Sequence, residues 1–175
     1  MLFRLGSWEP LSVPGAGGPM RQLDSQMPTW TTFAQARPEL AELGRQLLDE
    51  HNGYAYLATV TGDGAPRVHP VVPVLVDGRL VIAITAGSPK TADLRREPRY
   101  MLHATVGQQD TEFAVRGHAS EIVDGDLRRQ CVERQDLNQV TIADDQVVFE
   151  LRVDRVDVAA WPEGKPVRHR WTATG

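Results

Sequence analysis

Hydrophobic residues in the first third of the chain recur at helical spacing. Within Pro38–His51 the leucines at positions 40, 43, 47 and 48 fall on one face, and most of the positions between them are polar. Proline is favourable in the first turn of a helix, and Asn52-Gly53 is a typical C-terminal stop. We therefore expect an amphipathic helix over 38–51 that packs its leucine face against the rest of the domain.

From Tyr54 onwards the pattern changes to that of β-strands. The apolar runs are rich in β-branched and aromatic residues, and Gly62-Asp63-Gly64, Asp77-Gly78 and a turn around Gly107 are hairpin signals. The sequence predicts six strands: Tyr54–Thr61, Arg67–Val76, Leu80–Thr85, Tyr100–Val106, Thr111–Val123 and Gln146–Val158. Short strands joined by hairpins, with few helices between them, favour an antiparallel barrel over a parallel α/β sheet.

Two of these strands carry irregularities. Pro70 and Pro73 each remove a backbone N–H from the second strand. That strand must therefore lie at an edge, be bulged, or face something other than a neighbouring strand. In the last strand the apolar phase slips by one residue after Val153, which predicts a β-bulge.

The composition fits one globular domain. The chain has 175 residues, 41% hydrophobic and 24% charged, so its core needs no disulfide or structural metal. A net charge of -4 gives no general attraction for nucleic acid or an anionic membrane, and no apolar run reaches the ~20 residues that span a bilayer. The single Cys131 suits the reducing cytoplasm. We expect it in the core, on a short amphipathic helix over Asp126–Leu137 with Leu127 and Leu137 also facing inward.

Residues 1–30 differ from the rest because they are rich in Gly and Pro and have no sustained period. They lack the apolar core of a signal peptide. We interpret them as a flexible leader, or as a stretch upstream of a working start at Met20 or Met27, with an ordered arm as the alternative. The functional domain is then predicted over residues 31–175.

The segment with the most chemical content follows the third predicted strand. Ser88 is a good helix N-cap and Pro89 a good first helical residue, which places Lys90 and Thr91 in the first turn. A lysine is unfavourable there because it adds to the positive end of the helix dipole. Free backbone N–H groups, two hydroxyls and one cation form a good receptor for a phosphate, although a solvated lysine on a connecting helix is the simpler alternative. The stretch 87–100 carries a net charge of +2, because it contains Lys90, Arg95, Arg96 and Arg99 against Asp93 and Glu97.

Three stretches, Leu57–Val71, Leu80–Thr85 and Gly87–Pro98, resemble the pyridoxamine 5'-phosphate oxidase-like superfamily of FMN-binding proteins. The resemblance spans about residues 40–160 and implies a six-stranded antiparallel split β-barrel of Greek-key type, with FMN at a homodimer interface. Carried over by position, the residues that would line the flavin ring are Arg67, Val68, His69 and Pro70. Those that would bind the ribityl phosphate are Thr85, Ser88, Lys90 and Thr91.

Two departures from the family pattern argue against vitamin B6 oxidation. The chain lacks the C-terminal arginine-rich signature of true pyridoxamine phosphate oxidases, and Pro89 stands where those enzymes have a second basic residue. Short relatives in actinobacteria use either FMN or a deazaflavin coenzyme. A deazaflavin has a longer acidic tail, which would need further cations such as Arg95, Arg96, Arg99 or Lys165. The sequence leaves both cofactors open.

The function implied by the resemblance is hydride transfer between the flavin and a small organic substrate, with a separate electron donor. Because the cofactor carries this chemistry, no acid–base pair is needed and no catalytic residue is predicted. A non-catalytic flavin-binding or sensor module is the alternative. Neither a metal site nor a haem site, which some relatives of this fold have, is predicted, because the five histidines lie on separate elements without ligand spacing: His51, His69, His103, His118 and His169.

Overall fold

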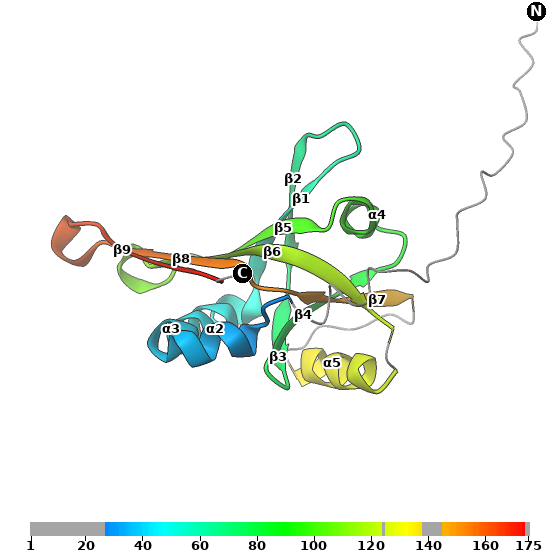
Figure 1. Cartoon of the computed structure of the whole chain (residues 1–175), viewed down its shortest axis with the longest axis horizontal. Coiled ribbons are helices and arrows are strands. Elements are labelled where there is room, and N and C mark those ends of the chain that lie inside the picture. The colour runs from blue at the N-terminus through cyan, green and yellow to red at the C-terminus, as the bar shows by residue number, and fades with distance from the viewer. Residues whose placement is uncertain (1–26, 124, 138–144, 174–175) are drawn as a thin grey trace, which may run out of the picture.

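Antiparallel strands with helices packed against them make up the protein in this computed structural model, which describes residues 27–123, 125–137 and 145–173 (Figure 1). The helices are α2 (Trp30–Ala36), α3 (Pro38–Asp49), α4 (Pro89–Arg96) and α5 (Gly125–Leu137), with short 3-10 turns η1 (His51–Gly53), η2 (Gln108–Asp110) and η3 (Pro162–Gly164). The strands are β1 (Ala55–Val60), β2 (Pro66–Val71), β3 (Pro73–Val76), β4 (Arg79–Thr85), β5 (Arg99–Ala104), β6 (Glu112–Ile122), β7 (Gln146–Leu151), β8 (Arg155–Ala160) and β9 (Val167–Thr172). The expected class, mainly β with flanking helices, is confirmed.

The prediction of six strands is wrong, since the described residues form nine. The predicted strand 67–76 is divided into β2 and β3, because the chain leaves β1 at Val72 and pairs with β4 from Pro73 onwards. The predicted strand 146–158 is likewise divided into β7 and β8. Strand β9 has no counterpart in the prediction, because its side chains are almost all exposed and it lacks the apolar alternation that marks a half-buried strand.

The strands form one curled sheet in the order β2-β1-β5-β6-β7-β4-β3, and β8 and β9 extend it from β6. The long strand β6 joins the two branches, because its first half pairs with β8 and its second half with β7. Among the described strands β2 pairs with β1 alone, which makes it an edge strand, one of the three alternatives that Pro70 and Pro73 left open. Its free edge leaves backbone groups open to a ligand or to a second chain.

The β-bulge predicted in the last strand is confirmed at the junction of β7 and β8. The register against β6 shifts by one residue there, so that residues 152–154 lie opposite residues 117–118. Gly117 makes this possible, because a Cβ on it would lie 1.8 Å from the carbonyl oxygen of Arg152. Val153 at the centre of the bulge is fully buried, and its N–H donates to the carbonyl of Pro28 at 2.8 Å.

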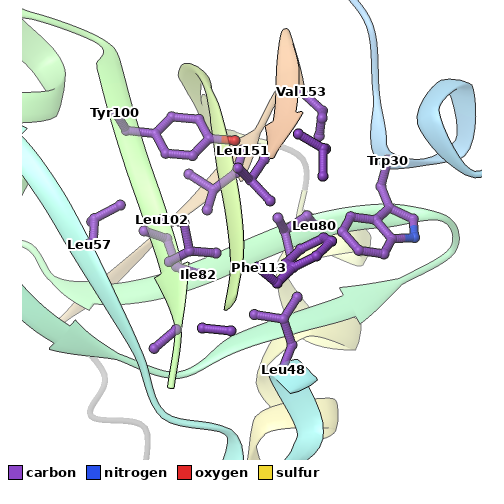
Figure 2. Packing of buried hydrophobic residues seen from close by; sticks show 14 of the residues in the cluster. Trp30, Leu48, Leu57, Leu80, Ile82, Tyr100, Leu102, Phe113, Leu151 and Val153 are labelled. Atoms are coloured by element: carbon purple, nitrogen blue, oxygen red, sulfur yellow. The ribbon is translucent and has the colours of Figure 1, made fainter. Parts of the chain in front are cut away.

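The main core lies inside the curl of the sheet and is closed by α2 and α3. Figure 2 shows Phe113 of β6 between Trp30 of α2 and Leu48 of α3, with Leu80, Ile82 and Leu151 from the strands around it. Gly44 of α3 leaves room for the Phe113 ring, because a Cβ there would lie 2.2 Å from its Cζ. The predicted leucine-faced helix is thus confirmed as α3, and its role is packing.

Helix α2 is an element that the sequence pattern does not reveal. It has only seven residues, and a capping box between Thr29 and Thr32 starts it. Its Trp30 and Phe33 are buried. Residues 1–26 of the predicted leader lie outside the described residues, so the division into residues 1–30 and 31–175 stays a prediction.

The turn between β3 and β4 is the Asp77-Gly78 hairpin turn that the sequence predicts. Both residues have positive φ angles, 47° and 73°, as a type I′ turn requires. The Gly78 carbonyl accepts hydrogen bonds from the backbone N–H and the hydroxyl of Thr31 at 3.1 and 2.8 Å. The turn therefore also anchors α2.

Helix α5 confirms the predicted helix near residues 126–137 and packs against β3 and β4. Cys131 is buried with Val74, Val76, Val81 and Val148, and Leu127 packs against this cluster, while the side chain of Leu137 lies outside the described residues. Burial raises the pKa of the Cys131 thiol to about 11, which leaves it protonated and unreactive at neutral pH. None of the described helices is long and apolar enough to cross a membrane.

Candidate cofactor site

The first turn of α4 follows β4 directly and forms a polar bend. Ser88 is the N-cap, as predicted, and its Oγ accepts from the backbone N–H of Thr91 at 3.4 Å. The Thr91 hydroxyl lies 3.0 Å from Ser88 Oγ and donates to the carbonyl of Thr85 at 2.8 Å. Thr91 is fully buried, so its hydroxyl holds the bend together, whereas Thr85 is exposed and Ser88 is half-buried.

Lys90 occupies the same turn and is half-buried. It makes no ion pair with any residue in the described part of the chain. No acidic residue lies in this first turn to offset the lysine and the partial positive charge of the helix N-terminus. A lysine without an ion pair to any described residue thus stands at a helix N-terminus, an arrangement that favours a bound anion.

Arg67 and His69 of β2 face this bend from the edge of the sheet. Both are half-buried, and the positive charges of Lys90 and Arg67 both act on the His69 ring. Burial, together with these two charges, lowers the pKa of His69 below its usual 6.5, so the ring is neutral at pH 7. Its Nε2 is buried and has no hydrogen-bond partner among the described residues.

Asp93 lies under the bend and is a site residue that the sequence analysis missed. It is only 3% exposed. Its Oδ2 accepts from Arg67 Nη1 at 2.7 Å and from the Thr59 hydroxyl at 3.0 Å, and its Oδ1 accepts from Arg96 Nη2 at 2.9 Å. No sequence signal links Asp93 to Arg67, because the contact depends on α4 packing against the strand next to β2.

Burial on its own raises the pKa of Asp93, since it disfavours the charged carboxylate. The hydrogen bonds from Arg96 and Thr59 and the charges of Arg67 and Arg96 outweigh that effect and leave the pKa below its usual value. Asp93 is therefore a carboxylate at neutral pH and holds two arginines in fixed positions.

The two remaining residues of the predicted ring-lining set point to the other face of β2. Val68 is 61% exposed and Pro70 is also exposed, and they lie opposite Ala58 and Tyr56 of β1. The structure thus brings Arg67, His69, Ser88 and Lys90 together but leaves the side chains of Val68 and Pro70 outside this group. Only a molecule lying against the free edge of β2 would contact residues of both faces.

Two further arginines near the bend, Arg95 of α4 and Arg99 of β5, are each paired with a carboxylate. Arg95 forms a two-pronged pair with Glu121 of β6, with both distances 2.8 Å. Arg99 forms a similar pair with Glu97. The count of +2 over residues 87–100 does not describe the bend by itself, because two partners from outside this stretch join it: Glu121 pairs with Arg95, and Arg67 pairs with Asp93.

No group of three or more His, Cys, Asp or Glu residues is placed to hold a metal ion within the described ranges. A separate groove lies at the opposite end of β5 from α4 and is lined by Val106, Asp110, Glu112, Trp161 and Gly164. It contains none of the predicted cofactor residues.

A family model described as pyridoxamine 5'-phosphate oxidase matches residues 41–159. No protein with a curated description matches the chain.

Several solved structures have a similar fold. One is a heme binding protein from Mycobacterium smegmatis, with a TM-score of 0.61 and 22% identity over 78% of this chain and 59% of that protein. Another is a pyridoxamine 5'-phosphate oxidase-related, FMN binding protein from Nostoc punctiforme (TM-score 0.58, 13% identity, 82% of this chain and 97% of that one). A third is PhzG from Burkholderia lata 383, in complex with tetrahydrophenazine-1-carboxylic acid (TM-score 0.57, 16% identity, 88% and 91%). At these identities the likeness extends to the fold alone.

Proposed function

The chain belongs to the pyridoxamine 5'-phosphate oxidase family, and from this premise we propose that it binds FMN and works as a flavin-dependent oxidoreductase on a small organic substrate. The observation that carries the proposal is Lys90, an unpaired cation among the described residues in the first turn of a helix, beside the free edge of β2. A related protein of the same fold is described as FMN binding. The single, buried cysteine fits a reducing cytoplasmic setting, which we include in the proposal.

The residues around the α4 bend fit a flavin phosphate. Lys90, the Ser88 hydroxyl and the first-turn N–H groups provide donors and positive charge. Among the described residues Arg67 uses only its Nη1, on Asp93, so its other donors remain available to a ligand. The buried His69 Nε2 lacks a partner within the described part of the chain, as expected of a group that completes its hydrogen bond with a ligand. The free edge of β2 offers backbone groups to the flavin ring.

FMN suits this site better than a deazaflavin coenzyme with a long acidic tail. Such a tail would need the further cations that the sequence analysis named. Arg95, Arg96 and Arg99 are each already paired with a carboxylate of this chain. The fourth candidate, Lys165, directly follows η3, whose Gly164 lines the groove at the opposite end of β5 from α4. Because only one phosphate needs to be held by Lys90 and its neighbours, we assign the shorter cofactor.

We also propose that the protein acts as a homodimer. Three large apolar residues lie exposed on one face of the β1–β2 hairpin. Tyr56 and Val68 are 52% and 61% exposed, and Tyr54, just before β1, is 50% exposed. Exposed apolar residues gathered on one strand pair mark an interaction surface. A second copy docked on this face would also approach the edge of β2, and so would border the cofactor site.

Within the proposed mechanism, bound FMN supplies hydride transfer to or from the substrate. Lys90 and Ser88 would hold the phosphate, and Arg67 would keep a positive charge beside it. Neutral His69 would offer Nε2 as a hydrogen-bonding group at the site. No acid–base pair of side chains is required, so positioning is the main task of the protein.

The test is to release the cofactor from purified protein and identify it by mass spectrometry. We expect FMN, whereas a deazaflavin would contradict the cofactor assignment. Bleaching of the bound flavin by a nicotinamide donor, followed by reoxidation on adding an acceptor, would support the oxidoreductase. Bound flavin that stays inert to donors and acceptors would instead support a non-catalytic flavin-binding module.

A further inference from the structure

Asp93 connects the two halves of the proposed cofactor site. Through Arg67 it is bonded to β2, and through the Thr59 hydroxyl to β1. Asp93 itself lies in α4, whose first turn carries Ser88 and Lys90. A single buried carboxylate thus links β2, which is proposed to lie along the flavin ring, to α4, which is proposed to bind the flavin phosphate.

We infer that Asp93 is a positioning residue, which fixes the distance between β2 and the α4 bend so that ring and phosphate are held at the same time. The inference rests on the proposed function. A ligand held at both ends binds more tightly than its parts only if the two subsites keep the right spacing. Charge-assisted hydrogen bonds to a carboxylate that is itself only 3% exposed are strong enough to set that spacing.

A purely electrostatic role would have the opposite consequence. Asp93 is the only acidic partner of Arg67 among the described residues, and it reduces the positive charge around the bend. Removing its charge would therefore attract a phosphate more strongly. Positioning predicts weaker FMN binding in the same variant, so the sign of the change separates the two roles.

The experiment compares Asp93→Asn with Glu121→Gln as a matched control. Glu121 also holds an α4 arginine, Arg95, but anchors it to β6 on the side away from β2. Each protein is titrated with three probes: FMN, riboflavin as the ring without the phosphate, and inorganic phosphate alone. Flavin fluorescence reports the first two, and calorimetry reports the third.

For Asp93→Asn we expect FMN affinity to fall at least tenfold, while the affinities for riboflavin and inorganic phosphate stay within about threefold of the original protein. Glu121→Gln should change all three by less than twofold. If Asp93→Asn binds FMN as tightly as the original protein or more tightly, the inference is overturned. An equal loss for all three probes also overturns it, because that result means general damage to the site.

Two further measurements keep the test decisive. Thr59→Val removes one hydrogen bond to Asp93, while Asp93 keeps its charge and the side chain at position 59 keeps its shape. This variant should weaken FMN binding about threefold, and it provides the test if Asp93→Asn does not fold. Amide hydrogen exchange over residues 88–96 in ligand-free protein should be faster in the Asp93 or Thr59 variant than in Glu121→Gln. If the original protein binds no flavin, the proposed function fails, and unchanged exchange would separately disprove the positioning role.

Discussion

Two buried carboxylates, Asp93 and Glu150, are each held by two arginines, yet they lie in very different surroundings. Asp93 uses both oxygens for Arg67, Arg96 and Thr59, and it joins a helix to an edge strand. Glu150 of β7 receives Arg79 and Arg152 on the same oxygen, at 3.1 and 3.2 Å, while its Oε1 has no hydrogen-bond partner among the described residues. Equal burial and equal charge therefore do not imply the same role.

The difference lies in what each carboxylate holds in place. Around Asp93 the arginine on β2 uses only its Nη1 among the described residues, and Lys90, which acts on the same His69 ring, makes no ion pair with them, so the cluster can face a ligand. Around Glu150 the neighbouring strands β4 and β6 continue the sheet on both sides. We therefore expect Glu150 to matter for stability and Asp93 for the proposed site, and four predictions test that division.

The largest effect is expected from Glu150→Ala. It leaves Arg152, whose side chain is 13% exposed, without its carboxylate, and breaking a buried ion pair in this way costs about 3 kcal/mol. Urea unfolding should show this loss. FMN affinity, measured well below the unfolding temperature, should stay within twofold, and a tenfold loss would mean that the two regions are coupled.

Next in size is the effect of Lys90→Ala on FMN binding. Losing one charge-assisted contact to a phosphate should weaken binding about 30-fold, or about 2 kcal/mol. Riboflavin affinity should not change, because riboflavin has no phosphate. Lys165→Ala serves as the control, since Lys165 is an exposed lysine far along the sequence, beside η3. Full FMN affinity in Lys90→Ala would refute the phosphate assignment.

A smaller effect concerns acid stability. Because the pKa of Asp93 is lower in the folded protein than its usual 3.8, its contribution is complete above that value and is lost as the pH falls below it. Between pH 6 and pH 3 the melting temperature should fall less in Asp93→Asn than in the original protein. The difference should be about 3 °C, which corresponds to about 1 kcal/mol. An identical fall in melting temperature in both proteins would mean that Asp93 does not titrate in this range.

The smallest effect is the pH dependence of FMN binding. In the free protein His69 is neutral at pH 7, because burial and the charges of Lys90 and Arg67 lower its pKa. A bound phosphate would offset those charges and favour protonation, so FMN affinity should rise about threefold from pH 8 to pH 6.5. His69→Gln should remove this trend, and riboflavin should show none.

Local features of the sequence predicted much of the fold. The Ser88 cap, the Asp77-Gly78 turn, the leucine face of α3 and the bulge after Val153 all depend on a few neighbouring residues. The edge position of β2 is one of the alternatives that the prolines left open. Elements whose signal is weak or spread out escaped, such as the short helix α2 and the exposed strand β9.

The candidate site was predictable only in part, for the same reason. Resemblance and spacing pointed to Lys90 and Ser88, which lie on one continuous turn. Whether the arginines of α4 were free depended on partners from other strands, and Glu121 showed that Arg95 was not. Along β2 the side chains of Arg67 and His69 point to one face of the sheet and those of Val68 and Pro70 to the other.

The sequence alone determined where α3 and α4 begin and where the β3–β4 hairpin turns, because backbone geometry and capping act within a few residues. Only the tertiary structure decided that Asp93 meets Arg67 across 26 positions and that Lys90 has no acidic partner among the described residues. Charge pairing depends on distances of a few ångströms, and packing sets those distances. Resemblance and spacing along the chain therefore pointed to the candidate site, whereas the fold showed which of its charged residues are paired.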